Sequence, residues 1–552
     1  MPPKQKKRTR KSLVKKGGTK AQGATAQIKV EVSDFKQDKQ DDAMDTQKMF
    51  EHGPGITETS LKFRSGPDLK FNYKMAIDKM LRHAKLKPRA TDNMLGCSRI
   101  LKWVSGMSGT DAPAVVIDHL LPKCHRELWA ADPYAAAQVF LVNAIGKHAE
   151  HVYCDSQSTL KGIPAPCVLH GGKVCAIPTD EQDLAVFGFE CKLNSQRGND
   201  RYARDCVWPE GTNAHMETYY ISYNHVKKFR PKVVILENVE GVLRRRGGES
   251  DDSVLEFLLN DKEWGLRNLH DYDVHVKMLR STDFYLPQPR PRVWILLIRG
   301  DVARPPEQLE VLWRRLEGTL GEPYPIRSFL LPLDHELLAE GARPLFAEPN
   351  LELDDECAAD IADYYNSFKD LLACAVQANL LPPRHKFPTL TDRISRNMDR
   401  HPAWPMTQWT LANIDVHHEI IKLKLGKLQL ESDDNHSGVI ATPVADVSQK
   451  PGRSGIQLYG GCPTLCTSSR LFWFVKGEAG FLLPHEHFSL QGWPVDQINL
   501  AHLTPGEAFT LPGNAMSLTT LAAPVMIALW ILGFLEEFGP QANHIEARAK
   551  GA

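Results

Sequence analysis

Short apolar runs that each end in a polar residue recur along the first part of this 552-residue chain. They constrain the fold more than any other feature. The clearest run is Val233–Leu236, which follows Lys232 and is followed directly by Glu237. Four consecutive apolar residues predict a strand that is buried on both faces, as in a parallel sheet covered by helices. The acid at its end is then either a helix cap or a catalytic group at the edge where open α/β sheets bind ligands.

Similar runs come earlier in the chain, and helical segments separate them. The strands are expected at Arg99–Val104, Glu127–Asp132, His151–Cys154 and Leu184–Phe187. Helices are expected at Asp111–His119, with Asp111 as the N-cap, and at Pro133–Asn143. Alternating strands and helices predict an α/β fold with a doubly wound, Rossmann-like sheet.

Several residues that can do chemistry follow the ends of these strands. Asp132, Asp155 and Cys191 would therefore lie on the same rim of the sheet as Glu237. By itself, Cys191 is either a small core residue or a nucleophile. The turn Ser105–Thr110, which contains Gly106 and Gly109, is either a plain connection or a loop whose backbone approaches a nucleotide-like ligand.

Two later segments carry further candidate site residues. Alternation places Gln288, Arg290 and Arg292 on one face of an extended segment ahead of an apolar strand. Arginines held there could bind an anion or a carbonyl, or form a solvated edge. Near the C-terminal end, Asn514 precedes an apolar segment, where it can cap a helix or reach a ligand.

In this order, the segments resemble the cytosine-5 DNA methyltransferase family. The resemblance rests on Ser105–Gly109, Asp132–Ala135, Gly188–Cys191, the Glu-Asn-Val of Glu237–Val239, the QxRxR pattern of Gln288–Arg292, and Gly513–Ala515. It covers about residues 95–300 and 455–540, with a target-recognition region between them. It implies a Rossmann-like methyltransferase sheet with an inserted, irregular target-recognition domain.

The resemblance also implies roles for individual residues. Cys191 would be the nucleophile, Glu237 would hold and protonate the base, and Arg292, supported by Arg290, would bind the base carbonyl. The cofactor would be S-adenosylmethionine, and the substrate double-stranded DNA with the base flipped out. RNA as the substrate, or a protein that binds without turnover, are the alternatives. The cofactor-binding residues would be Ser105, Gly106, Met107, Gly109, Asp132, Asp155, Asn514 and Ala515.

The chain departs from the family's usual residues at several of these positions. Glu190 and Lys192 flank the thiol where the family has Pro and Gln, and they would shift its pKa in opposite directions. Ser108 replaces a glycine and Val104 an aromatic residue in the cofactor loop. Ala130 stands where a ribose-binding acid is usual, which leaves Asp132 or Glu127 for that role.

Composition suggests how the chain is divided. The predicted parts are a basic disordered tail (1–55), a catalytic domain in two parts (56–300 and 456–540), the target-recognition region (301–455) and a short tail (541–552). Residues 1–20 hold seven Lys and two Arg and no acid, which suits nucleic acid or a nuclear-import receptor and predicts a nuclear protein. A disordered solubilising tail would have the same composition.

The sequence suggests neither a membrane anchor nor a metal centre. Leu521–Leu535 is apolar but too short for a span, so we expect a core helix and no membrane partner. Eleven cysteines without a regular framework predict reduced thiols. Cys462 and Cys466 have no second pair of ligands beside them, so no metal-ligating residue is assigned.

Overall fold

The described residues cover most of the predicted catalytic domain. The computed structural model describes residues 70–89, 99–143, 149–191, 214–243, 253–317, 321–332, 441–449, 455–474 and 480–538, with a few single positions between 335 and 425. Both predicted tails, Lys192, and most of the 301–455 region lie outside the described residues.

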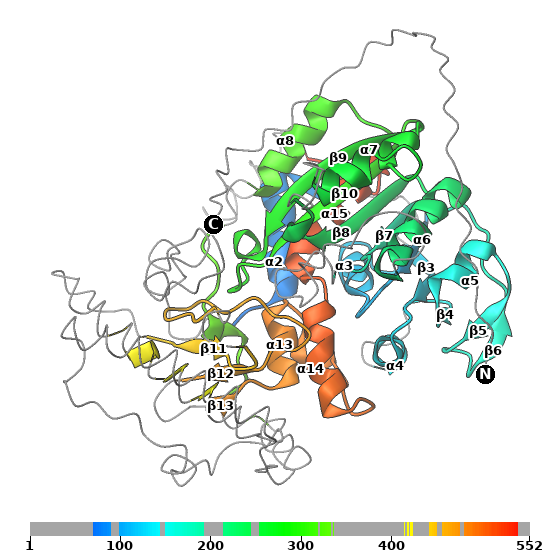
Figure 1. Ribbon diagram of the computed structural model, residues 1–552. Coiled ribbons are helices and arrows are strands. Elements are labelled where there is room, and N and C mark those ends of the chain that lie inside the picture. The colour runs from blue at the N-terminus through cyan, green and yellow to red at the C-terminus, as the bar shows by residue number, and fades with distance from the viewer. Residues whose placement is uncertain are drawn as a thin grey trace, which may run out of the picture. The chain divides into compact units, whose positions relative to one another are not determined.

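A nine-stranded sheet forms the centre of the described fold (Figure 1). Its order is β6-β5-β4-β3-β2-β7-β8-β10-β9, and the strands from β4 to β8 run parallel. The hairpin β5–β6 extends one edge, and β10 runs antiparallel between β8 and β9. The strands are β2 (Leu101–Gly106), β3 (His125–Ala131), β4 (Val152–Tyr153), β5 (Ala165–Cys167), β6 (Lys173–Cys175), β7 (Leu184–Phe187), β8 (Val233–Val239), β9 (Tyr272–Arg280) and β10 (Pro291–Arg299).

Helices cover both faces of this sheet, which explains the continuous apolar runs. In β8, Val233 and Ile235 face one hydrophobic core, whereas Val234 and Leu236 face the other. The first core contains α2 (Tyr73–Ala84), α3 (Ala112–Leu120), α4 (Ala135–Asn143), α8 (Pro306–Glu317) and α15 (Leu518–Ile531). The second contains α6 (Ala214–Phe229) and α7 (Val254–Asn260). The predicted doubly wound α/β fold is confirmed.

The order of the strands reverses between β2 and β7. From β2 the chain builds outward through β3 and β4, and it then returns to add β7 and β8 on the other side. Open α/β sheets bind ligands at the carboxyl ends of the strands at such a reversal. Because β10 is antiparallel to β8, its first residues lie at this same end of the sheet.

A smaller three-stranded sheet lies beside the last helices. It consists of β11 (Val444–Asp446), β12 (Leu471–Trp473) and β13 (Gly480–Phe481). The chain continues through α13 (Pro484–Leu490) and α14 (Pro505–Asn514). Thus β11, from the predicted target-recognition region, pairs with a strand beyond it, and α8 packs in the main core. The domain boundaries stay predictions.

At two positions where the sequence offers a helix cap, the side chain does not cap the helix. Asp111 precedes α3, but its side chain makes no capping hydrogen bond and instead accepts one from Ser105 Oγ at 3.1 Å. Asn514 ends α14 rather than capping α15, which begins after Ser517. In both cases the local residue type suggested a capping hydrogen bond that the structure does not form.

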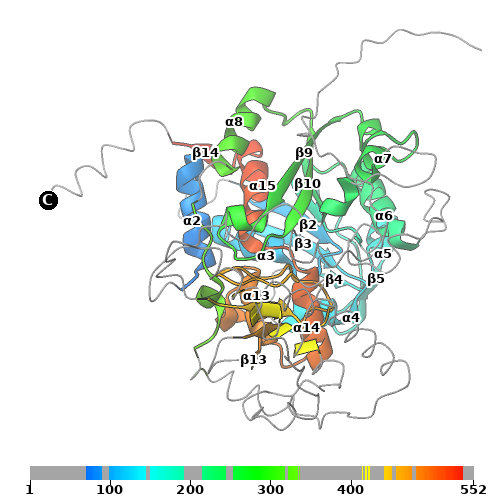
Figure 2. The same cartoon turned by 60° about the vertical axis from the view of Figure 1, so that its left-hand side comes forward.

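The last apolar helix is a core element, as expected. Every residue of α15 is buried. Among the described helices, no single one has the length and composition of a membrane span. Taken together, α14 and α15 have that length and composition, but they are bent by 45° where they meet. After α15, β14 (Leu535–Glu537) pairs with β1 (Leu86–Pro88), which follows α2. Figure 2 shows β14 beside the end of α2.

Candidate active site

Hydrogen bonds hold the loop that carries Cys191 on three sides. The Gly188 amide donates to Gly106 O at 3.4 Å, which joins the loop to the end of β2. From β8, Asn238 Nδ2 donates to Phe189 O at 3.0 Å. From α6, Thr218 Oγ1 accepts the Glu190 amide at 2.9 Å. The side chain of Cys191 therefore projects from a loop whose backbone is hydrogen-bonded to both strands next to β7.

An ion pair lies beside this loop. Arg292 Nε is 2.9 Å from Glu237 Oε1, and both side chains are largely buried, with 13% and 14% of their areas exposed. A Cβ on Gly188 would lie 4.0 Å from Glu237 Oε2, so the carboxylate reaches the base of the loop. The structure thus brings the predicted nucleophile, acid and arginine together.

The acidity of the Cys191 thiol follows from these neighbours. Burial raises its pKa, and the charges of Glu237 and Glu190 raise it further. Arg292 and Arg290 act in the opposite direction. The sum is a pKa above that of an ordinary cysteine, so the thiol is mainly protonated at neutral pH. Cys191 forms no disulfide.

Arg290 is held by backbone carbonyls beside this site. Its guanidinium is buried and donates to Leu465 O at 2.6 Å, Gly513 O at 2.8 Å and Ala515 O at 3.0 Å. These carbonyls belong to segments that come far later in the chain. Arg290 therefore positions the end of α14 against the start of β10, and Arg292 is the arginine that faces Glu237.

Two amides of this site were given no role of their own by the sequence. Gln288 donates to Leu490 O and Gln491 Oε1 and accepts the Leu465 amide, so it joins the same segments as Arg290. Asn238, which holds the thiol loop, had been noted only as part of a motif. Polar residues directly beside a predicted catalytic acid or arginine are the signal that could have identified both.

The loop after β2 is tied to β3 through the serine that replaces a glycine. Ser108 Oγ donates to Ala131 O at 3.3 Å and accepts the Ala131 amide at 3.2 Å. It also lies 2.7 Å from Ser105 Oγ, which is buried and lies 3.0 Å from Glu127 Oε1. Ser108 therefore supports the loop, and Ser105 faces the interior instead of a ligand.

Both acids considered for ribose are buried. Glu127 is completely buried and faces Ser105 and Asp111, and burial raises its pKa well above the usual value. Asp132 is also buried, and its oxygens accept the amides of Gly109 and Tyr134, both at 2.8 Å. Asp132 therefore organises the loop at the end of β3.

A pocket of about 330 Å³ opens beside these loops. Of the predicted cofactor residues, Met107 and Asp155 line it, whereas Ser105, Gly106, Gly109, Asp132, Asn514 and Ala515 do not. Asp155 is exposed and caps α5 (Ser156–Lys161) by accepting the Ser158 amide at 2.6 Å. The lining comprises Met107, Pro133, Asp155, Ser156, Gln157, Ser158, Lys161, Glu217, Thr218 and Ile221.

Glycines allow the loops around the pocket to approach closely. A Cβ on Gly106 would lie 2.5 Å from the Phe187 ring. A Cβ on Gly109, whose φ is +56°, would lie 3.7 Å from Asn514 O. The predicted first and last cofactor segments are therefore neighbours in space, and their backbones rather than their side chains make the contact.

The fold and this arrangement together define a Rossmann-like methyltransferase. Comparison with known proteins assigns part of the chain to a family. Residues 137–332 match the family of C-5 cytosine-specific DNA methylases. The match contains Cys191, Glu237, Arg290 and Arg292, and it begins after the Ser105–Gly109 loop. The chain therefore carries a domain of this family, as the motifs predicted.

Individual relatives are distant and longer than the matched segments. The chain is 24% identical over 362 residues to "DNA (cytosine-5-)-methyltransferase DMT5" of Cryptococcus neoformans, covering 65% of this chain and 14% of the fungal protein. It is 28% identical over 122 residues to "Type II methyltransferase M.HhaI" of Haemophilus parahaemolyticus, covering 22% of this chain and 32% of that enzyme. Among solved structures, S. pombe Dnmt2 methyltransferase aligns over 78% of this chain and 99% of its own, with 12% identity and a TM-score of 0.39.

The family uses S-adenosylmethionine as its methyl donor, and the pocket fits this cofactor. Its volume is within the range of small-molecule sites. Met107, Pro133 and Ile221 offer apolar contacts for an adenine ring. A carboxylate has about four acceptor positions, so Asp155 can cap α5 and still accept from a ribose or an amine.

Proposed function

We propose that this chain methylates carbon 5 of cytosine in double-stranded DNA through a covalent adduct with Cys191. The observation that carries the proposal is the Glu237–Arg292 ion pair directed at the thiol loop. Carbon 5 of cytosine is a weak nucleophile, so the reaction needs a thiol, an acid and a donor to the carbonyl at one place. The relatives named DNA methyltransferases support DNA as the substrate.

The residues would act in a defined order. The Cys191 sulfur adds to carbon 6 of the ring, and Glu237 supplies a proton to ring nitrogen 3 while accepting a hydrogen bond from the exocyclic amine. Arg292 donates to the base carbonyl and keeps Glu237 in place. S-adenosylmethionine supplies the methyl group to carbon 5. Loss of the carbon-5 proton then expels the thiolate and restores the aromatic ring.

The raised pKa of Cys191 fits this sequence. The thiol has to lose its proton before its sulfur adds to the ring, and the charges of Arg292 and Arg290 favour that loss. In a duplex the reacting atoms are stacked, so the cytosine is rotated out of the helix to reach the loop.

The test measures transfer of a labelled methyl group from S-adenosylmethionine to duplex DNA. We expect incorporation with the wild-type chain and loss of at least about a thousandfold with Cys191→Ala, because the covalent step disappears. Cys154→Ser is the matched control, since Cys154 is a free, exposed cysteine of the same domain. Equal incorporation by the wild type and Cys191→Ala contradicts the adduct.

Two further measurements examine the adduct and the nucleic acid. A duplex with fluorine at carbon 5 cannot lose a proton there, so it should stay bonded to Cys191 and add its mass to the Cys191 peptide. Competition between duplex DNA and transfer RNA determines the substrate. Preferential labelling of the RNA would contradict the DNA proposal while leaving the Cys191 chemistry intact.

A further inference from the structure

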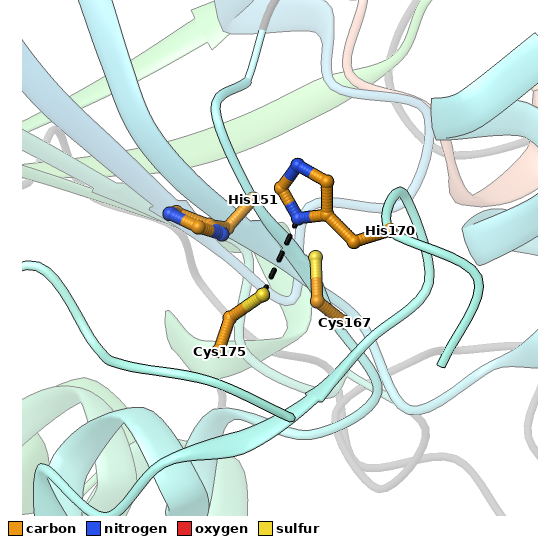
Figure 3. Close-up of side chains that lie close together, drawn as sticks. All are labelled: His151, Cys167, His170 and Cys175. Carbon is orange, nitrogen blue, oxygen red and sulfur yellow. Dashed lines mark hydrogen bonds between the residues drawn. The ribbon is translucent and has the colours of Figure 1, made fainter. Parts of the chain in front are cut away.

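Four side chains with soft or imidazole ligand atoms meet at the edge of the main sheet, away from Cys191. They are His151, Cys167, His170 and Cys175, and their ligand atoms all lie within 4.8 Å of one another. Figure 3 shows the four side chains directed toward a common point. We propose that they form a structural Zn²⁺ site of the Cys₂His₂ type.

The register of the strands explains why three of them converge. Tyr153 of β4 pairs with Cys167 of β5, and Ala165 of β5 pairs with Cys175 of β6. Paired residues share a face of a sheet, and so do residues two positions apart. His151, two residues before Tyr153, therefore lies on the same face as both cysteines.

The turn between β5 and β6 brings in the fourth ligand. Gly171 and Gly172 have φ values of +66° and +82°, which favour glycine over residues with a side chain. The amides of His170 and Gly172 donate to Cys167 O at 3.2 and 2.9 Å, so the turn folds back over the strand end. His170 Nδ1 then lies 3.4 Å from Cys175 Sγ.

These distances match zinc coordination. Zn–S bonds of about 2.3 Å and Zn–N bonds of about 2.0–2.1 Å in a tetrahedron place the ligand atoms about 3.3–3.8 Å apart. The His170–Cys175 distance is already in that range, and a bound ion would draw in the wider pairs. Two thiolates and two imidazoles in a closed tetrahedral set favour Zn²⁺ over Mg²⁺ or Ca²⁺, which prefer oxygen.

The surroundings supply two further features of such a site. Cys167 Sγ is buried and accepts the Val152 amide at 3.4 Å, a contact that stabilises a thiolate. Nδ1 of His151 is buried and has no hydrogen-bond partner among the described residues. A buried ring nitrogen without a partner is costly unless it binds something. Both cysteines are free of disulfides.

The position of the cluster indicates what the ion would do. The hairpin β5–β6 lies at the sheet's edge, its strands are short, and the outer strand is mostly exposed. Short hairpins that bury little apolar area are only marginally stable unless a disulfide or a metal ion cross-links them. A bound ion would hold the β5–β6 hairpin against β4. Strand β4 leads directly to Asp155 and α5 at the cofactor pocket. The ion is therefore structural and stands apart from Cys191 chemistry.

The test measures metal bound to the full chain, purified with a phosphine reductant and without chelator. Mass spectrometry of the metal content should give about one zinc per chain, and X-ray absorption should give sulfur and nitrogen neighbours at the distances of a Cys₂His₂ site. Cys175→Ser should lower zinc at least about tenfold. Cys175→His, which restores a ligand, and Cys154→Ser, which removes an exposed cysteine nearby, should keep it.

Several results would overturn the site. These are wild-type chain without zinc, a stoichiometric metal other than zinc, zinc that Cys175→Ser retains in full, or a Cys167–Cys175 disulfide in the reduced preparation. Hydrogen exchange gives a second readout on the wild type, since the amides of residues 165–175 should exchange faster after removal of the ion by a chelator. Unchanged exchange would contradict a structural role.

Discussion

Cys191 lies under two opposing influences at the end of β7. Burial and two nearby carboxylates hold the thiol protonated, while two arginines favour the thiolate. Glu190, which stands where the family usually has Pro, is one of the two carboxylates that raise the pKa of the thiol. Its amide is fixed by Thr218, so its charge stays near the thiol. The glutamate at this position therefore makes the free thiol less reactive than burial alone would.

Replacing Glu190 should make this thiol more acidic. Removal of one negative charge in Glu190→Gln lowers the pKa of Cys191, whereas Arg292→Met raises it. Alkylation of the Cys191 peptide by iodoacetamide, followed by mass spectrometry between about pH 7 and pH 10, gives the midpoint of the titration. We expect the order Glu190→Gln, wild type, Arg292→Met from lowest to highest midpoint. An unchanged midpoint in both variants would contradict an electrostatic role for these residues.

Buried polar side chains of the QxRxR segment hold separate helices and strands together. Gln288 is fully buried, and its hydrogen bonds join the segment before β10 to α13 and to the residues before β12. Arg290 joins that segment to the end of α14. The QxRxR segment thus holds the last part of the catalytic domain against the sheet.

Gln288→Leu should destabilise the fold although it hardly changes the side-chain volume. It leaves the Leu465 amide and the Leu490 carbonyl without their partner, which costs about 1–3 kcal/mol for each buried group. Urea unfolding measures the loss. Gln308→Leu, on the exposed side of α8, is the matched control and should change the free energy of unfolding by less than about 0.5 kcal/mol. Equal effects of the two substitutions would contradict the role of the Gln288 hydrogen bonds.

The helices α13 and α14 each have a glutamate as their third residue. The pKa values of these two glutamates are shifted in opposite directions. In α13, burial raises the pKa of Glu486 to about 7, although the carboxylate accepts the Leu483 and Leu331 amides. In α14, hydrogen bonds from Thr504 lower the pKa of Glu507. The stabilising contribution of Glu486 is present at low pH and is lost as the pH rises from about 4.3 to about 7.

Urea unfolding at several pH values should separate the two glutamates. Glu486→Gln removes the loss of stability on going from about pH 5 to about pH 8, because the neutral amide does not ionise. Glu507→Gln should instead lose stability mainly above about pH 4.3, where the wild-type carboxylate is charged. A Glu486→Gln variant with the wild-type pH profile would show that Glu486 titrates normally in the fold.

At the scale of the whole molecule, the doubly wound sheet was predictable because its strands are short continuous apolar runs. The shared edge of Cys191 and Glu237 followed from the same reasoning, since the ends of parallel strands share one edge, whereas only the family resemblance joined Arg292, at the start of antiparallel β10, to them. Contacts between distant segments were not predictable. Arg290 binds carbonyls that lie 175 to 225 residues away, and Glu127 is buried beneath the cofactor loop. The zinc ligands have no recognisable spacing, because three of them are aligned by strand register and the fourth by a turn.

The pairing of β1 with β14 joins the two ends of the described catalytic fold. Leu535 is 1% exposed, packs in the main core and has Pro88 as its strand partner. Leu535→Ala should lower the free energy of unfolding by about 2–4 kcal/mol through the cavity it leaves. Glu536→Ala removes only the exposed ion pairs with Lys87 and Arg89 and should cost less than about 1 kcal/mol. Thermal or urea unfolding compares the two, and a larger effect of Glu536→Ala would contradict this.

The β1–β14 pairing also bears on how such a domain is used in larger polypeptides. The strand that follows α2 and the last strand of the described fold are hydrogen-bonded neighbours, so the first helix and the end of the fold are tied to each other. The alignment with the fungal relative spans only 14% of that protein, so a comparable domain there sits within a much longer polypeptide. Sequence after β14 could be lengthened or exchanged without redirecting any strand of the main sheet.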